Sequence, residues 1–549
     1  AQFYFGMPIA MVLLCIFVLP IYYRLNVYTA YEYLESRFDL KTRSLTALLF
    51  LVQRGLAAGL TIYAPSIIMS NIMGWPLNTT ILLIGTLVII YTVAGGTKAV
   101  SVTQKQQMIV ILSGMFIAAV VLVFQLPENV SFGDAVGVAG KMGKLEVVNF
   151  EFDLSNRYTF WSGMLGGVFL FMSYFGTDQS QVQRYLSGKS LAESRLGLLF
   201  NGLVKVPMQF LVLFVGILVF VFFQFVQPPV HYNNANLDKL QTDAVYQEQL
   251  SNLQREYSLV FEEKKAAIQN LITAMDSGEN TAVDEAQTEV QQLLAQERTV
   301  RNDVRQLITD KDEDAETNDG DYIFITFITN YLPKGLIGLL LAVIFSAAMS
   351  STSSELNALA TTTMVDIYRR SLFKHQSDKH YFLASKWLTV FWGCLALLFA
   401  ATASLFDNLI EAVNIVGSLF YGTILGVFLV AFFFNEKNNK ARFLGIFTGA
   451  ALGTIIVALF TGELNLYEIA LGAPIGSVVG YFTIQNTFRH ITGTTVFIAA
   501  FIAEALVIVI FVLDITAYLW LNLIGCLLVI FFSWLIQLLR PNRLANDSV

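Results

Sequence analysis

The sequence predicts an all-α, polytopic membrane protein, and composition and hydropathy carry this prediction. Mean hydropathy is +0.60, 55% of the 549 residues are hydrophobic, and only 14% are charged. Apolar runs of about 20 residues recur, each long enough to cross a hydrocarbon core about 30 Å thick. The three cysteines lie inside apolar runs and the four histidines are scattered, so the sequence indicates neither disulfides nor a transition-metal site.

Thirteen segments have the length and apolarity of a membrane span. They are about 3–23, 45–72, 79–97, 105–126, 160–186, 197–226, 335–366, 380–404, 408–434, 441–460, 466–485, 496–513 and 518–539. The segment 466–485 is the weakest, because it contains Glu468 and Pro474. Residues 321–333 are expected to form a short interfacial helix that leads into 335–366.

Basic residues mark one side of the membrane. Alternating the spans divides the short loops into two sets, and one set holds most of the Lys and Arg. The positive-inside rule places this set in the cytoplasm. The start of the chain, the loop 127–159 and the long insert 231–320 are then outside. The expected location is the plasma membrane, and a bacterial inner membrane is favoured.

The insert 231–320 differs in composition from the rest of the chain. It holds 19 acidic and 8 basic residues, a net charge of −11, whereas the remainder holds 22 acidic and 26 basic residues, a net of +4. Apolar residues recur at heptad-like spacing on both sides of Ser277–Asn280, which predicts an antiparallel helical hairpin standing outside the membrane. The favoured interpretation is a solvated spacer, because no catalytic or metal spacing appears in it.

The stretch 342–368 begins as an apolar helix and then becomes crowded with small and hydroxyl residues. Ala347, Ser350, Ser351 and Ser354 stand at i, i+3, i+4 and i+7, so they share one helix face. Their oxygens are of the kind that a small, hard cation such as Na⁺ prefers. The alternative is that this face only packs against a neighbouring helix.

Charged side chains at bilayer depth are costly, so each is a candidate for function. Lys205 lies several residues inside its span and is expected to face a solute or an ion-pair partner. Arg54 is expected to be the structural partner of a carboxylate. Glu411 begins its span at the outer end, and Glu504 lies mid-span, where it can pair with a neighbouring helix.

The segment 160–186 begins Gly-rich and apolar and becomes polar at Thr177, Asp178 and Gln179. Residues 176–179 are therefore a candidate helix break. Broken helices expose backbone ends and form midplane binding sites in transporters. The alternative is an unbroken amphipathic helix that ends in the cytoplasm.

Four stretches together resemble the sodium:solute symporter family, which includes the sodium–glucose, sodium–iodide and sodium–monocarboxylate cotransporters. They are VYTAYEYLESRFDLKTR (27–43), GGTKAVSVTQKQQ (95–107), GTDQSQVQRYLSGKS (176–190) and SAAMSSTSSELNALATTTMVDIY (346–368). The resemblance implies a leucine-transporter-like fold, a five-plus-five inverted repeat with peripheral helices. The pair 441–460 and 466–485 is additional to that plan.

The resemblance also implies a sodium site, with Na⁺ as the coupling ion. The family binds the ion on an A-x-x-S-S face of its eighth core helix, which corresponds to the Ala347 carbonyl and the Ser350 and Ser351 hydroxyls. The remaining ligands would be carbonyls of the first core helix. Since 3–23 resembles the second core helix, we expect this polypeptide to lack that half of the site. If it is a truncation, we expect it not to transport alone.

The substrate-binding residues that the resemblance suggests are Lys205, Asp178, Gln179 and Glu411. Lys205 resembles the lysine that hydrogen-bonds sugar hydroxyls in sugar-transporting members, although Tyr4 replaces an acidic residue of their site. A lysine has three donors, which suit polyols or a carboxylate. A sugar or polyol is the first choice, and a monocarboxylate or other anion is the alternative.

The predicted function is Na⁺-coupled import of a small polar solute by alternating access, within a lipid bilayer. The predicted division is 1–226 for the first repeat, without its first helix, and the start of the second repeat, 227–320 for the hairpin insertion, 321–440 for the rest of the second repeat, and 441–549 for peripheral helices. A transporter-like sensor, or a scaffold acting through the hairpin, is the competing class. The sequence shows no nucleophile–base set and no phosphate loop, so neither an enzyme nor a nucleic-acid partner is expected.

Overall fold

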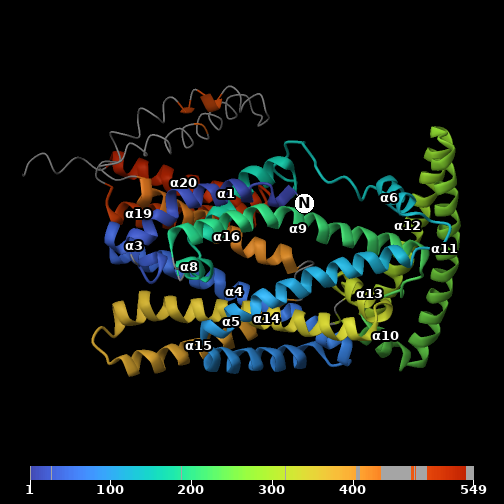
Figure 1. The fold of residues 1–549 in the computed structure, drawn as a ribbon, viewed down its shortest axis with the longest axis horizontal. Helices are drawn as coiled ribbons and strands as arrows, with labels where there is room; N and C mark the ends of the chain where they lie inside the picture. Colours follow the sequence, from blue (N-terminus) through green and yellow to red (C-terminus); the bar gives the residue numbers. More distant parts are fainter. Residues whose placement is uncertain are drawn as a thin grey trace, which may run out of the picture.

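The structure is a computed structural model of the chain that describes residues 2–25, 27–186, 188, 190–313, 315, 317–403, 409–433, 450, 472–474, 476–477 and 491–539. All regular structure in these residues is helical. The membrane helices form one bundle of roughly parallel and antiparallel elements, and two long helices cross one end of it (Figure 1). This architecture confirms the predicted all-α class.

Ten of the predicted spans are confirmed within the described residues, although the single element α5 (Leu77–Phe124) contains two of them, 79–97 and 105–126, which were expected to be joined by a loop. The helical segments that are long and apolar enough to cross a membrane are Gln2–Leu25, Leu40–Ser70, Leu77–Ala94, Gln106–Phe124, Leu191–Phe225, Lys334–Leu372, Asp378–Ala400, Glu411–Phe433, Gly493–Val512 and Tyr518–Leu539. The predicted span 160–186 contains a shorter apolar helix, Ser162–Gly176. The predicted spans 441–460 and 466–485 lie almost entirely outside the described residues.

The helices up to the insert follow one another with short connections. They are η1 (Gln2–Tyr4), α1 (Met7–Leu13), η2 (Leu14–Val18), α2 (Leu19–Leu25), α3 (Ala30–Arg37), α4 (Leu40–Met73), α5 (Leu77–Phe124), α6 (Phe132–Lys141), η3 (Ser162–Gly166), α7 (Gly167–Gly176), α8 (Gln179–Leu186) and α9 (Leu191–Phe225). Local signals set their ends. Asp39 accepts a hydrogen bond from the Thr42 backbone N–H and caps α4, whose other end is Gly74 at φ +65°.

The insert and the second half of the chain are also helical. Their elements are α10 (Asn234–Gln241), α11 (Ala244–Ser277), α12 (Asn280–Lys311), η4 (Gly320–Tyr322), α13 (Ile323–Tyr331), α14 (Lys334–Thr362), η5 (Thr363–Leu372), α15 (Asp378–Ala400), α16 (Leu409–Phe433), α19 (Gly493–Val512) and α20 (Tyr518–Leu539). Helix α13 confirms the short helix predicted before 335–366.

Helix α16 lies at the centre of the bundle, packed against α4, α7, α19 and α20. Two glycines let it approach α20 closely. A Cβ atom on Gly422 would lie 2.7 Å from the carbonyl oxygens of Leu521 and Asn522, and one on Gly426 would lie 2.7 Å from Cβ of Val529. Small residues at such contacts allow the backbone approach on which membrane helices depend.

The basic loops meet at one end of the bundle. Arg370 after α14 pairs with Glu35 of α3 at 2.5 Å, and Arg43 at the start of α4 pairs with Asp366 at 2.6 Å. The Tyr23 hydroxyl, near the end of α2, donates to the carbonyl of Tyr185 at the end of α8. These loops therefore share one side, as the alternation of spans predicts, and the insert lies at the other end (Figure 1).

Helices α11 and α12 form the predicted antiparallel hairpin. Gly278 adopts φ +72° and ends α11 in the left-handed conformation. The buried residues of both helices include those of the predicted apolar stripes, such as Leu250, Ile268, Val290 and Val304. The hairpin lies across the ends of the membrane helices, roughly perpendicular to them (Figure 1).

Candidate functional site

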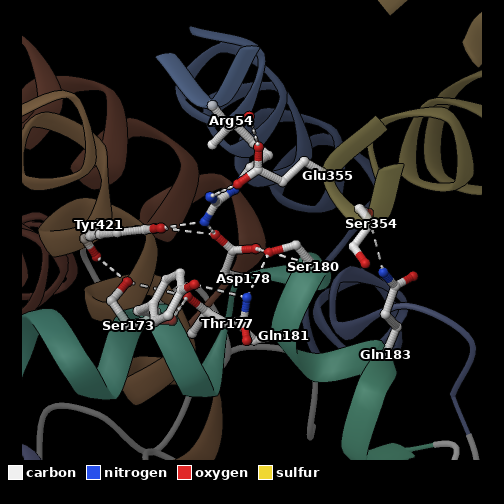
Figure 2. Close-up of polar contacts among 12 residues, drawn as sticks. Arg54, Ser173, Thr177, Asp178, Ser180, Gln181, Gln183, Ser354, Glu355 and Tyr421 are labelled. Atoms are coloured by element: carbon white, nitrogen blue, oxygen red, sulfur yellow. Dashed lines mark hydrogen bonds and ion pairs between the residues drawn. The ribbon is translucent and has the colours of Figure 1, made fainter. Parts of the chain in front are cut away.

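A buried guanidinium holds four helices together inside the bundle (Figure 2). Arg54 of α4 is only 2% exposed. It donates to Asp178 at the start of α8, to Oε1 of Glu355 in α14 at 3.0 Å, and to the Tyr421 hydroxyl in α16 at 2.6 Å. The prediction that Arg54 is the structural partner of a carboxylate is thus confirmed, with two carboxylates rather than one.

Asp178 occupies the predicted helix break. Helix α7 ends at Gly176 and α8 begins at Gln179, so the unbroken alternative is wrong. The carboxylate accepts hydrogen bonds from the Ser180 backbone N–H at 2.8 Å and the Ser180 hydroxyl at 2.7 Å, which caps α8. Its other oxygen also accepts from the Tyr421 hydroxyl at 2.8 Å.

Tyrosine hydroxyls satisfy the carbonyls that the break releases. Tyr22 donates to the carbonyl of Gly176 at 2.8 Å, and Tyr31 donates to the carbonyl of Thr177 at 3.0 Å. Both rings are fully buried. Irregular backbone at membrane depth is tolerated only where such partners exist. The sequence analysis missed both tyrosines, although Tyr31 belongs to TAYEYL, in a stretch that carries the resemblance.

Glu355 extends the network along α14. Its second oxygen accepts from the Thr61 hydroxyl at 3.0 Å, and Thr61 in turn accepts from the Thr352 hydroxyl at 3.1 Å. One arginine therefore faces two carboxylates, which leaves an excess of negative charge in a buried place. The hydroxyls and the positive N-terminal end of α8 offset part of the desolvation cost of the two buried carboxylates.

The three predicted sodium ligands lie on α14, within about two turns before Glu355. Ser350 is buried, Ala347 is half-buried and Ser351 is exposed. They share one helix face, as their spacing requires. Their oxygens fit a hard cation, and the described residues contain no group of three His, Cys, Asp or Glu side chains that could hold a metal. Sodium binding by these residues remains a prediction.

The four predicted substrate residues lie in different places. Lys205 is half-buried on α9, with its ammonium 5.7 Å from the centre of the Tyr4 ring. Asp178 belongs to the Arg54 network. The side-chain amide of Gln179 is already hydrogen-bonded to backbone groups. Its oxygen accepts from the Ala30 N–H at 3.1 Å, and its nitrogen donates to the Tyr28 carbonyl at 3.0 Å.

Glu411 pairs with Arg157 near the end of the bundle that carries the insert. The structure therefore does not bring Glu411 and Asp178 into direct contact with each other or with Lys205. Substrate binding by the four residues remains a prediction. Tyr421 is the main network residue that the sequence analysis missed, since an apolar run surrounds it and no motif marks it.

The helical bundle, the broken helix and the buried network define a transporter-like membrane protein. The chain matches the model of the sodium:solute symporter family over residues 1–249 and 309–449, and it belongs to that family. The gap in the match, 250–308, lies inside the α11–α12 hairpin, so this part of the hairpin is additional to the family's plan.

Three curated relatives are similar to most of the chain. The mouse (Mus musculus) sodium-coupled monocarboxylate transporter 2 is 26% identical over 78% of this chain and 55% of its own. The rabbit (Oryctolagus cuniculus) sodium-dependent multivitamin transporter is 27% identical over 78% of this chain and 54% of its own. The human (Homo sapiens) sodium/iodide cotransporter is 26% identical over 80% of this chain and 56% of its own. The chain thus spans about half the length of these relatives.

A solved structure shows the same fold. It is the substrate-bound, outward-open state of a Na⁺-coupled sialic acid symporter, with a TM-score of 0.55 and 21% identity over 88% of this chain and 83% of that one. The predicted leucine-transporter-like fold is confirmed.

Proposed function

We propose that this protein couples the inward movement of Na⁺ to the import of a small anionic solute by alternating access. Its membership of the sodium:solute symporter family supports coupling to sodium. Relatives named for monocarboxylates and for iodide support an anion as the cargo. The alternation itself would move helices of the bundle around a central site.

Lys205 is the observation that carries the choice of an anion. Lys205 lies within membrane helix α9, its ammonium forms no ion pair with a described residue, and it lies 5.7 Å from the centre of the Tyr4 ring. An uncompensated charge at membrane depth is costly. An anionic solute that reached this ammonium would supply the missing charge.

The aromatic residues around Lys205 lead to helix α7. The Tyr4 ring stacks on Phe171 with ring centres 5.7 Å apart, and Tyr174, one turn further along α7, lies under the Arg54 guanidinium at 5.5 Å. The proposed solute contact and the Arg54 network therefore share one helix. Movement of α7 would therefore change both the proposed solute contact and the Arg54 network.

Sodium would bind at the Ala347, Ser350 and Ser351 face of α14. Glu355 lies one turn further along the same helix and holds Arg54. Binding of the ion would therefore favour one position of α14, which carries the Glu355 side chain of the Arg54 network. Coupling of this kind requires that the ion bind the two conformations with different affinity.

A sugar or polyol is the second candidate for the solute. The three donors of Lys205 can serve hydroxyl groups as well as a carboxylate. The charge of the ammonium favours the anion, because an anionic solute would offset the cost of burying that charge.

Uptake into proteoliposomes tests the proposal, measured on the chain as given and on the chain extended at its start by the first core helix of a family member. The panel contains lactate, pyruvate, iodide, glucose and inositol, each with an inward gradient of Na⁺ or of K⁺. We expect Na⁺-dependent uptake of an anion and loss of that uptake in Lys205→Met, whereas Lys41→Met, at an exposed lysine of α4, should behave as the unaltered chain. Uptake of glucose or inositol alone would overturn the choice of an anion.

A second pair of variants tests the sodium face. Ser351→Ala should raise the Na⁺ concentration for half-maximal uptake about tenfold, on the scale of one lost ligand, whereas Ser385→Ala on α15 should not change it. Equal Na⁺ dependence in both variants would contradict the assignment of Ser351.

A further inference from the structure

A cavity of about 360 Å³ lies where α9 meets the hairpin, at the end of the bundle that carries the insert. Its inner wall is apolar and comes from α9, with Gly216, Phe220 and Phe223 among its residues. Gly216 precedes the end of α9 at Phe225 by nine residues, about 14 Å at a rise of 1.5 Å per residue. The cavity therefore reaches from the membrane surface into the depth of the acyl chains.

An unpaired acceptor is buried in the wall of this cavity. Gln224 is only 4% exposed, and its amide N–H donates to the carbonyl of Phe220 at 2.9 Å. Its Oε1 atom accepts no hydrogen bond from a described residue. A buried acceptor without a donor is costly, so a ligand of this cavity should bring a hydroxyl or another donor group.

The outer rim of the cavity is cationic, although the insert as a whole is acidic. Arg298 and Arg301 line the cavity beside Glu297, and two further basic residues of the insert, Lys264 and Arg305, bind carboxylates of this region. These carboxylates are Glu297, which binds Lys264 at 2.5 Å, and Asp319, which binds Arg305 at 2.9 Å.

One positive charge on this rim forms no ion pair within the described residues. Arg301 pairs with Glu297 and Asp319 at 3.6 Å each and donates to the carbonyl of Pro229 at 2.9 Å. Arg298, by contrast, lines the cavity, is exposed, and forms no ion pair with a described residue. A third cation, Lys144, lies 4.7 Å from the centre of the Phe220 ring. The rim can therefore hold a phosphate.

We propose that this cavity binds an anionic phospholipid of the outer leaflet whose headgroup carries hydroxyls, such as phosphatidylglycerol. One acyl chain lies along the apolar wall of α9, and the phosphate pairs with Arg298. A headgroup hydroxyl donates to Oε1 of Gln224. The lipid thereby joins the hairpin to α9, the helix that also carries Lys205. A small transported anion would use the rim but not the deep apolar wall.

Lipid binding to the purified, delipidated full chain tests this proposal. Phosphatidylglycerol, phosphatidic acid and phosphatidylcholine with identical acyl chains are titrated in detergent, and bound lipid is counted by native mass spectrometry. We expect affinity to fall in that order. Arg298→Gln should weaken phosphatidylglycerol binding about tenfold, because it removes one charge-assisted contact. The matched control is Arg255→Gln, at an exposed arginine of α11 that does not line the cavity, and it should bind as the unaltered chain.

A second variant tests the headgroup contact. Gln224→Leu should remove the preference for phosphatidylglycerol over phosphatidic acid while phosphatidic acid still binds. The ratio of the two affinities in the unaltered chain tests the same contact without a mutation. Equal binding of phosphatidylcholine and phosphatidylglycerol, unchanged binding in Arg298→Gln, or displacement of the lipid by the transported solute would overturn the proposal.

Discussion

The chain contains two buried charge networks, one inside the membrane bundle and one in the hairpin, and they differ in what they join. The Arg54 network links residues that are 124, 301 and 367 positions apart. The hairpin network links Lys264 to Glu297 across 33 positions and Arg305 to Asp319 across 14. The first can form only after the bundle has assembled, whereas the second closes within one insert.

The surroundings of the two networks differ as well. Water can reach parts of the hairpin and replace a lost partner there, but the membrane offers no such replacement. Loss of one partner should therefore cost more around Arg54 than around Asp319. The difference also suits function, because the Arg54 network joins helices that alternating access must move, whereas the hairpin network holds elements that can stay together.

The largest effect is expected from Arg54→Gln. It leaves Asp178 and Glu355 buried without their cation, at a cost of about 3–5 kcal/mol. We expect a large fall in the unfolding temperature and loss of Na⁺-driven uptake. The unfolding temperature and uptake of Arg54→Lys should lie between those of the unaltered chain and of Arg54→Gln, because a lysine keeps the charge but lacks the planar guanidinium with its several donors. Arg24→Gln, at an exposed arginine of α2, is the control; if it destabilised the protein as much, the buried network would not be the cause.

A smaller effect is expected from Asp319→Asn. The carboxylate of Asp319 accepts from the Tyr232 backbone N–H at 2.9 Å and binds Arg305 and His231. Loss of this carboxylate should lower the free energy of unfolding by about 2 kcal/mol. It should also raise the rate of amide hydrogen exchange at the base of the hairpin, whereas uptake should persist. Asp303→Asn, at an exposed position of α12, should leave exchange unchanged. Equal exchange in both variants would mean that Asp319 does not hold the hairpin.

The same residue predicts a dependence on acid pH. Burial raises the pKa of Asp319, but hydrogen bonds from His231, Tyr232 and Arg305 outweigh it and hold this pKa well below its usual range. A lowered folded pKa means that the stabilisation is complete above the unfolded pKa of about 3.9 and is lost as the pH falls below it. Exchange protection at residues 230–243 should therefore decline below about pH 4. The decline should be absent in Asp319→Asn, and an identical decline there would assign it to another group.

The smallest effect is expected from Tyr421→Phe. It removes one hydroxyl from the Arg54 network but leaves Arg54 bound to Asp178 and Glu355, so the cost should be about 1 kcal/mol. Thermal unfolding and uptake should both change slightly. The control is Tyr33→Phe, because the Tyr33 hydroxyl donates to the carbonyl of Ala431 at 2.8 Å, outside the network. A loss in Tyr421→Phe as large as that in Arg54→Gln would place the hydroxyl, not the ion pairs, at the centre of the network.

The sequence by itself predicted the helical class, the ten spans that the described residues show and the hairpin. These features depend on properties that a short window contains, namely apolar length for a span and heptad spacing for a helix pair. The break at Gly176 could be offered from the sequence only as one of two alternatives, because an apolar run that becomes polar within four residues also fits an unbroken helix end. Arg54 was recognised as the partner of a carboxylate on the cost of its burial alone.

Only the tertiary structure decided which groups meet. No local pattern connects Arg54 with Tyr421, because ion pairs and hydrogen bonds between distant segments depend on how helices pack rather than on spacing along the chain. The orientation of the hairpin was also decided at this level. Its heptads determine the contact between α11 and α12, but whether the pair projects from the membrane or lies across it depends on apolar contacts with α6 and α9, which bury surface that neither helix could cover alone.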